Sequence, residues 1–311
     1  MRNGRSGTGT IGRRKLLVVG AGDIGQRVIA AIAARSPVTA LTSTPANTHR
    51  LKRMGARVVR ADLDKPGTLS RLPGDWRLLL HCAPPPPRGA RDTRTRNLLR
   101  MLASSAPCMR ESLSRTIVYL STSGVYGDRK GALVGETATP APACARARRR
   151  VDAERRLTVA ARRLGWRLTI LRVPGIYSQT RLPIERLKSG LPAIVATEDS
   201  YTNHIHAADL AAIAIKALYR AWTRPRVRIY NANDDSDFLM GDYFDLVARA
   251  FALPPPPRLA RAQIESAVSP MQYSFMRESR RMDNSRLKRE LRFRFQFPTV
   301  ADGVGRARNA A

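Results

Sequence analysis

Short apolar runs alternate with stretches of helical spacing along the first 175 residues. The runs are continuous rather than alternating and are stopped by turn residues, which is typical of buried parallel strands. We expect such strands at 15–20, 38–41, 57–59, 76–82, 117–120 and 168–171, and a later one at 226–230. Apolar residues at helical spacing predict helices at 24–34, 97–102 and 146–164. Strands that alternate with helices indicate right-handed crossovers and a parallel sheet.

The pattern loosens after about residue 175. Helical spacing predicts helices at 183–187, 207–221 and 240–253, and Asn284 is expected to cap a short helix. An apolar cluster follows in a late loop and suits a substrate pocket, a subunit contact or the core; it consists of Met271, Tyr273, Phe275 and Met276.

These elements predict an α/β fold, a Rossmann-type doubly wound parallel sheet with a smaller C-terminal substrate lobe. The core is expected to span 15–175. The lobe is expected to span 176–311, with 200–235 returning to the core. Residues 1–14 are expected to form a disordered basic tail, because they contain almost nothing apolar.

The 311-residue chain carries a formal net charge of +31, and 48 of its 55 basic residues are arginine. A nucleic-acid partner is one interpretation. The arginines are dispersed, however, and no nucleic-acid motif accompanies them, so we favour solvated surface arginines and expect no specific nucleic acid. No apolar run approaches the roughly 20 residues of a membrane span, so no membrane is expected. Three widely spaced cysteines show no metal or disulfide pattern, which suits a cytoplasmic location.

Gly20-Ala-Gly22-Asp-Ile-Gly25 stands where the first strand turns into a helix. The first glycine permits the tight turn, the second lets a pyrophosphate approach the backbone, and the third lets the helix pack on the strand. The free amides at the helix N-terminus then face the phosphates. This context predicts a bound nicotinamide dinucleotide.

The second strand ends in Thr42-Ser43-Thr44-Pro45, without the acid that NAD-binding versions use to hold the ribose. Hydroxyl groups with Arg50 nearby suit a 2′-phosphate, so NADP is favoured over NAD; alternatively, Arg50 only decorates a helix. Asp62 is a candidate partner for the adenine amine, or else a cap of the following helix.

Several segments together resemble the extended branch of the short-chain dehydrogenase/reductase superfamily, the NAD(P)-dependent epimerases and dehydratases. They are the glycine loop, Asp62-Leu63, Ala83-Pro84, Ser121-Thr-Ser-Gly-Val-Tyr-Gly127, Arg172-Val-Pro-Gly-Ile-Tyr177 and Ile205-His-Ala-Ala-Asp-Leu210. The residues and the resemblance together imply a cofactor site of Gly20, Gly22, Asp23, Ile24, Gly25, Ser43, Thr44, Arg50, Asp62, Leu63, Ala83, Pro84, Arg150, Val173 and Pro174.

The resemblance implies a catalytic Ser or Thr at Thr122, and a Tyr and a Lys that this chain lacks. Anchoring on Glu154 puts Arg150 at the Lys position and Arg146 at the Tyr position, and 131–165 contain neither residue type. Arg146 cannot shuttle a proton, because arginine stays protonated, but it can polarise a carbonyl or bind an anion. Arg150 can replace Lys as the cation that holds the ribose. The chain is similar to atypical members that keep the fold without the pair.

Tyr126 is an alternative acid/base, although it is usually a packing residue in relatives. Ser123, Asn203 and His204 are expected to contact the substrate. We expect His206 to bond backbone near Asp209, which caps the following helix.

Two functions remain. One is an NAD(P)-binding oxidoreductase of the epimerase/dehydratase type that acts on a small polar substrate, sugar-like or carbonyl. The other is a non-catalytic NAD(P)-binding sensor or scaffold. A homodimer is possible in either case.

Overall fold

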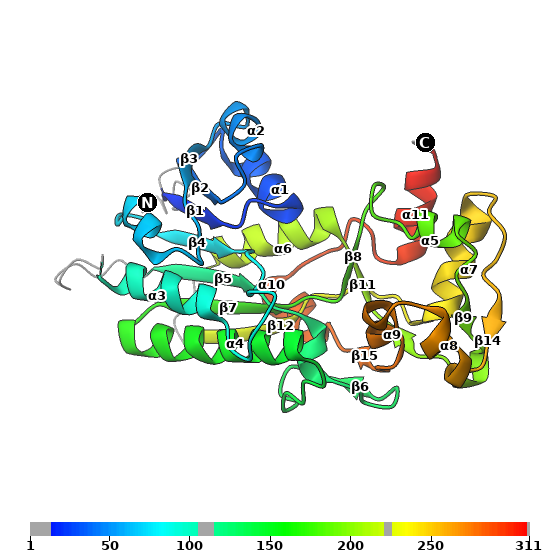
Figure 1. Cartoon of the computed structure of the whole chain (residues 1–311). Coiled ribbons are helices and arrows are strands. Elements are labelled where there is room, and N and C mark those ends of the chain that lie inside the picture. Colours follow the sequence, from blue (N-terminus) through cyan, green and yellow to red (C-terminus); the bar gives the residue numbers. More distant parts are fainter. Residues whose placement is uncertain (1–13, 105–114, 221–225, 310–311) are drawn as a thin grey trace, which may run out of the picture.

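Seven parallel strands form one sheet in the order β12-β7-β5-β4-β1-β2-β3 (Figure 1). They are β1 (Leu16–Val19), β2 (Val38–Thr42), β3 (Arg57–Arg60), β4 (Leu78–His81), β5 (Thr116–Leu120), β7 (Arg167–Arg172) and β12 (Val227–Asn231). The computed structural model describes residues 14–104, 115–220 and 226–309, so the tail predicted at 1–14 lies almost wholly outside the described residues. All seven predicted strands are present, and the Rossmann-type α/β fold is confirmed.

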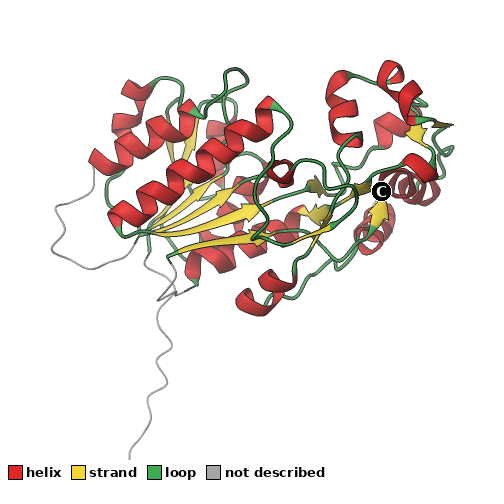
Figure 2. Ribbon diagram, turned by 90° about the horizontal axis from the view of Figure 1, so that it is seen from below, coloured by secondary structure: helices red, strands yellow, loops and turns green. Residues whose placement is uncertain are grey.

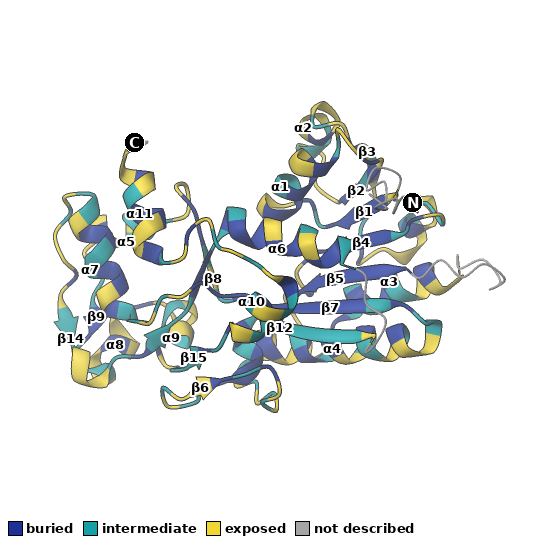
Figure 3. Ribbon diagram, turned by 180° about the vertical axis from the view of Figure 1, so that it is seen from behind, coloured by how far each residue is buried: buried dark blue, intermediate teal, exposed yellow. Residues whose placement is uncertain are grey.

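Successive side chains of the central strands enter two separate apolar cores, one on each face of the sheet. Val18 and Val118 belong to one core, and Leu17 and Ile117 to the other. The first face is covered by α1 (Asp23–Ile32), α2 (Asn47–Arg53), α6 (Ala207–Tyr219) and α10 (Ser285–Leu291). The second is covered by α3 (Thr93–Ser104) and α4 (Ala145–Leu164). Figure 2 shows helices on both faces, and Figure 3 shows the central strands buried between them.

A smaller lobe lies beyond one end of the sheet, at the right of Figure 1. Its helices are α5 (Ile184–Lys188), α7 (Met240–Ala250), α8 (Arg261–Ala267), α9 (Pro270–Met276) and α11 (Val300–Asn309). Two parallel strand pairs, β8 (Gly175–Tyr177) with β11 (His204–His206) and β9 (Ala193–Ile194) with β14 (Arg258–Leu259), lie in this part of the chain. α6 and β12 return to the large sheet, and Leu287 of α10 also packs into its core, outside the expected return at 200–235.

Some local expectations are wrong. The apolar cluster at 271–276 is not a loop but α9, which has Pro270 in its first turn and a capping box between Ser269 and Gln272. The side chain of Asn284 does not cap α10, because its amide donates to Asn233 O, Asp234 O and Asp235 Oδ1. α2 carries Arg50, as one of the two interpretations of that residue requires, whereas α8 and α11 were not expected.

Asp209 does not cap α6 either. Its carboxylate accepts hydrogen bonds from the backbone amides of Gln296 and Phe297, both at 2.9 Å. The cap is His206, whose Nδ1 accepts from Ala208 N at 3.2 Å. The aspartate therefore holds the C-terminal segment against α6.

Candidate functional site

The glycine loop joins β1 to α1 in a backbone shape that only glycine suits at its first position. Gly20 has a φ of +87°, and a Cβ there would lie 2.5 Å from the backbone nitrogen of Ala83. A Cβ on Gly25 would lie 2.8 Å from Gly20 O, whereas one on Gly22 would meet nothing within 4 Å. Gly20 therefore makes the tight turn, Gly22 leaves the backbone open to approach, and Gly25 lets the helix pack closely on the strand, as expected.

The N-terminus of α1 opens at Gly22, and no side chain caps it. Its first amides and the positive end of the helix dipole are available to an anion. Asp23 is paired with Arg27 at 2.8 Å and with Arg181 at 3.5 Å, which offsets its own charge. Ile24 is buried in the core and serves packing.

A cavity of about 320 Å³, here called the glycine-loop pocket, lies in front of this loop. Its lining residues are Gly20, Ala21, Gly22, Leu41, Thr42, Ser43, Thr44, Asn47, Ala61, Asp62, Leu63, Cys82, Ala83, Pro84 and Arg94. Six residues that the sequence predicts for the cofactor site therefore share this cavity: Ser43, Thr44, Asp62, Leu63, Ala83 and Pro84. Arg50 does not line the cavity; it is exposed on α2, one helical turn after Asn47.

Arg94, which the sequence analysis does not single out, fixes the wall of the glycine-loop pocket beside Asp62. Arg94 on α3 donates to Asp64 through Nε at 3.0 Å and Nη2 at 2.6 Å, and to Pro84 O through Nη1 at 3.2 Å. The Arg94 guanidinium lowers the pKa of the Asp64 carboxyl. Asp62 Oδ1 accepts from Asp64 N at 2.9 Å, so it orders this turn while facing the pocket. The contact spans 30 residues of sequence, and no local pattern announces it.

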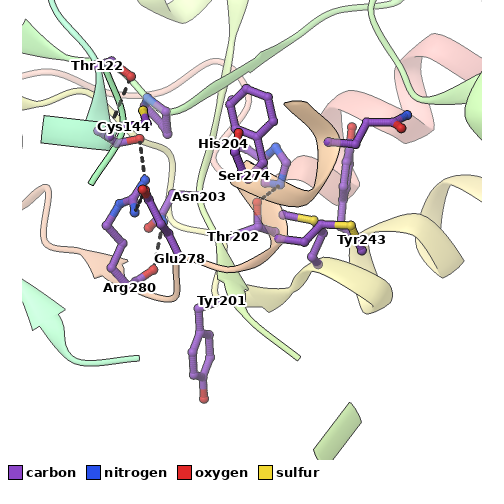
Figure 4. Close-up of a pocket in the computed structure, with 18 of the residues that line it drawn as sticks. Thr122, Cys144, Tyr201, Thr202, Asn203, His204, Tyr243, Ser274, Glu278 and Arg280 are labelled. Carbon is purple, nitrogen blue, oxygen red and sulfur yellow. Dashed lines mark hydrogen bonds and ion pairs between the residues drawn. The ribbon is translucent and has the colours of Figure 1, made fainter. Parts of the chain in front are cut away.

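A second cavity of about 320 Å³ lies between the sheet and the smaller lobe, and we call it the lobe pocket (Figure 4). From the sheet side it is lined by Thr122, Ser123, Gly124, Cys144, Arg146, Pro174 and Gly175. From the lobe side it is lined by Arg186, Tyr201, Thr202, Asn203, His204, Met240, Tyr243, Phe244, Gln272, Ser274, Phe275, Met276, Glu278 and Arg280. The predicted residues Thr122, Ser123, Arg146, Asn203 and His204 therefore share one cavity.

Polar contacts fix the sheet side of the lobe pocket. Thr122 Oγ1 accepts from Gly124 N at 3.3 Å, so its hydroxyl proton can point elsewhere. Arg280 pairs with Glu278 at 2.8 Å and lies 3.4 Å from Ser123 Oγ. Figure 4 shows Arg280 and Glu278 side by side, with the amide of Asn203 next to them. The one acidic side chain of this lining is therefore neutralised within it.

Asn203 and His204 hold the returning chain rather than point freely into the cavity. Asn203 donates to Arg280 O and accepts from Met282 N, at 2.9 and 2.8 Å. Nε2 of the buried His204 ring lies 3.2 Å from Thr202 Oγ1, and the ring centre lies 4.1 Å from that of Tyr243, with the two rings tilted by 42°. Burial lowers the pKa of His204 to about 3, so this ring is neutral at ordinary pH.

Tyr126 is placed away from both pockets. Its side chain is fully buried, and its hydroxyl donates to Asn231 Oδ1 at 2.6 Å. Burial raises the pKa of Tyr126, and Arg172, whose guanidinium lies 4.7 Å from the ring centre, opposes this shift. This geometry argues against Tyr126 as an acid/base and favours packing.

The two arginines at the Tyr and Lys positions have different surroundings. Arg146 is exposed at the start of α4 and lies over the Phe275 ring, 4.4 Å from its centre. Arg150 lines neither pocket; it donates to Tyr119 OH at 3.0 Å and Leu120 O at 2.9 Å. The Arg150 charge opposes the burial that raises the pKa of Cys82 to about 12, and Cys82 lines the glycine-loop pocket. Arg150 therefore lies near the glycine-loop pocket, whereas Val173 is buried in the core.

Buried histidines predict a loss of stability in acid. Burial, with the Arg150 charge, lowers the pKa of His81 to about 3, and burial alone does the same for His204. The unfolded imidazoles, with a pKa of about 6.5, bind protons first, so each of these groups lowers stability by about 1.4 kcal/mol per pH unit as pH falls below 6.5. Between pH 6.5 and 5, the free energy of unfolding should fall by about 2 kcal/mol less in His81→Gln than in the wild type, as measured by chemical denaturation. Equal losses would contradict this prediction.

Asp234 opposes that trend. Its carboxyl is 1% exposed, and burial raises its pKa to about 7. The folded carboxyl keeps its proton up to about pH 7, while the unfolded one loses it above about 3.9. This group therefore lowers stability as pH rises between those values. Asp234→Asn should be more stable than wild type at pH 8 by roughly 1–4 kcal/mol and similar at pH 4, measured by denaturation at both values.

Across the described ranges, no group of three His, Cys, Asp or Glu side chains is placed to hold a metal ion. None of the helices in those ranges combines the length and apolar character that crossing a bilayer requires. The glycine-loop pocket offers an uncapped helix N-terminus and hydroxyl-bearing residues, and the lobe pocket offers hydroxyl and guanidinium donors.

Comparison with known proteins agrees with this geometry. A family model described as NAD(P)H-binding matches residues 20–221. A conserved protein of unknown function from Silicibacter pomeroyi DSS superposes with a TM-score of 0.80 at 26% identity, over 96% of this chain and 99% of its own. UDP-glucose 4-epimerase from Thermus thermophilus, solved with NAD, gives 0.73 at 20% identity, over 95% and 98%.

UDP-N-acetylglucosamine 4-epimerase from Bacillus cereus gives a TM-score of 0.69 at 18% identity, over 96% of this chain and 98% of its own. Likeness to the two epimerases shows the shared fold. No curated protein matches the chain at a significant level.

Proposed function

Because the chain belongs to the NAD(P)H-binding family, we propose that it is an NAD(P)-dependent oxidoreductase of the epimerase/dehydratase type that acts on a small polar substrate, sugar-like or carbonyl. The observation that carries the proposal is that both pockets open along the carboxyl edge of one sheet. The glycine-loop pocket lies beyond β1, β2 and β4, and the lobe pocket beyond β5 and β7. Ligands of such sheets bind at this edge, where the strand order reverses.

The residues present suit a dinucleotide. Gly22 leaves open space at the N-terminus of α1 for the pyrophosphate. Thr42, Ser43 and Thr44 line the cavity where a ribose would lie. A nicotinamide bound beyond β4 would supply or accept a hydride next to Thr122. The epimerase from Thermus thermophilus was solved with NAD, which supports a cofactor of this kind.

Thr122 and Arg146 are the groups that we propose act on the substrate oxygen. The Thr122 hydroxyl donates a hydrogen bond to it, since Oγ1 already accepts from Gly124 N. Arg146 stabilises negative charge that develops there, but it transfers no proton because it stays charged. The proton then comes from solvent, through the open side of the pocket where Arg146 is exposed.

Turnover with a panel of carbonyl and alcohol substrates, followed by nicotinamide absorbance, tests this proposal. Thr122→Val and Arg146→Gln should each lower kcat/KM at least tenfold, the usual range for one lost charge-assisted contact. Arg155→Gln, an exposed position on the same helix, should leave kcat/KM within twofold. Equal activity in all three variants would sink the proposed roles.

We propose NADP as the preferred cofactor, with NAD as the alternative. The end of β2 presents hydroxyls and no carboxylate, and Arg50 stands one turn from Asn47 at the mouth of the pocket. Ser43→Asp should shift the ratio of NADP to NAD affinity at least tenfold toward NAD, because the new charge repels the 2′-phosphate and accepts from the ribose hydroxyls. Arg50→Gln should weaken NADP alone. An unchanged ratio in both variants, measured by calorimetry, would refute this preference.

A cofactor-binding sensor or scaffold is the second candidate. It is favoured by the absence of tyrosine and lysine from 131–165 and by the buried hydroxyl of Tyr126, which is held by Asn231. Saturable dinucleotide binding without turnover on the whole panel would select it over the enzyme.

A further inference from the structure

The lobe pocket contains positive charge that its own residues do not neutralise. Glu278 is its acidic side chain, and Arg280 pairs with it at 2.8 Å. Arg146 and Arg186 also line the pocket, and neither has a carboxylate partner among the residues that the structure describes. Two full positive charges are therefore left for a ligand.

Both arginines are held in place by aromatic rings rather than by acids. The Arg146 guanidinium lies 4.4 Å from the centre of the Phe275 ring on α9. The Arg186 guanidinium lies 4.7 Å from the centre of the Phe244 ring on α7, and it also donates to Pro192 O. Stacking of this kind orients a guanidinium and leaves its remaining N–H groups free for an anion.

The Arg186 side chain lowers the stability of the protein when no ligand is bound. Its Nε is buried and has no hydrogen-bond partner within the described residues. Burial lowers the pKa of the guanidinium, which means that its charged form is incompletely solvated. A desolvated cation without an acid is destabilising, and a bound oxyanion would remove that penalty.

The remainder of the lining is largely apolar and aromatic. Met240, Tyr243, Phe244, Phe275 and Met276 form the lobe wall, and α9 presents Phe275 with 51% of its surface exposed. An exposed phenylalanine beside a cavity is suited to cover an apolar or flat group. The volume of about 320 Å³ is at the small end for ligand pockets.

We propose that the substrate is a small anion, with a carboxylate or phosphate group bound by Arg146 and Arg186 and an apolar or aromatic body packed against Phe275 and Met276. This rests on the proposed function in treating the lobe pocket as the substrate site and in using Arg146, whose planar guanidinium has separate N–H donors for the reacting oxygen and for a neighbouring anionic group. The carboxylate and phosphate share the chemistry of an oxyanion that accepts charge-assisted hydrogen bonds.

Ligand-observed NMR titration of the full chain with benzoate, phenyl phosphate and neutral benzamide tests the inference. At least one anion should bind tenfold or more tightly than benzamide, and which one identifies the group. Arg146→Gln and Arg186→Gln should each weaken that anion at least tenfold. Arg155→Gln, exposed on the same helix as Arg146, should leave it within twofold, which separates the pocket from the +31 surface charge.

Three results would overturn the inference: benzamide binding as well as the anions, no binding of any probe, or equal weakening in Arg155→Gln. Arg146 is exposed, so its variant carries the test even where Arg186→Gln fails to fold. Dinucleotide titration of the same variants separates the two proposals. Intact dinucleotide binding without anion preference refutes the substrate class alone, and anion binding without dinucleotide binding refutes the cofactor function alone.

Discussion

Gly20→Ala is expected to abolish dinucleotide binding and to lower the free energy of unfolding by roughly 2–5 kcal/mol. The residue has a φ of +87°, and its new methyl group would lie 2.5 Å from the backbone nitrogen of Ala83. That nitrogen donates to Val19 O at 3.0 Å, so relief of the clash would disturb the junction of β1 and β4. Urea denaturation and calorimetric titration with NADP measure the two effects.

Gly22→Ala separates binding from stability. Its methyl group would meet nothing within 4 Å of the protein, and its φ of −76° suits any residue. We expect a change in stability below about 1 kcal/mol and a loss of dinucleotide affinity of at least tenfold, because the methyl group occupies the approach of the pyrophosphate. Gly67→Ala, at an equally open glycine that lines neither pocket, is the control. For the Gly20→Ala variant described above, a free energy of unfolding equal to that of the wild type would contradict this account of the turn.

Arg172→Met is expected to destabilise the protein by about 3–5 kcal/mol. Arg172 and Glu154 are 2% and 5% exposed, and their ion pair is 2.9 Å long. Glu154 also accepts from Ser121 Oγ at 2.5 Å, so the pair joins α4, β7 and the start of the Thr122 segment. Removal of the guanidinium alone leaves the Glu154 carboxylate buried without its cation, and an unpaired buried charge is strongly destabilising.

The double variant Glu154→Gln with Arg172→Met should recover much of that loss, because no unpaired charge remains and the glutamine still accepts from Ser121. A double-mutant cycle by chemical denaturation should give a coupling energy of at least about 1 kcal/mol. Additive effects would mean that the two side chains act independently.

The nucleotide-binding half could be predicted almost completely from local pattern. The strands β1, β4 and β5 are short apolar runs ended by turn residues, and the glycine loop fixes where the first crossover begins. The family match confirms the expected NAD(P)H-binding family, and the solved epimerase structures share the expected fold. The sequence also carries a local signal for α9, because Ser269 and Gln272 form a capping box and Pro270 stands in the first turn.

Other features depend on contacts distant in sequence. Arg94 reaches Asp64 across 30 residues, and Arg186 joins the lobe pocket only because α5 packs near α7. Arg149 and Glu154 are charged side chains that are buried on α4, because Arg149 bonds Gly89 O and Glu154 bonds Arg172. Hydrophobic spacing cannot reveal a buried charge whose partner lies on another element.

The central claim is that a nicotinamide dinucleotide binds in the glycine-loop pocket. Isothermal titration of the wild-type chain and of Gly22→Ala with NADP and with NAD, at physiological ionic strength, tests it most directly. The account predicts saturable binding of one dinucleotide per chain, tighter for NADP, that weakens at least tenfold in Gly22→Ala. Absence of saturable binding to the wild type, or equal binding to both proteins, would contradict it.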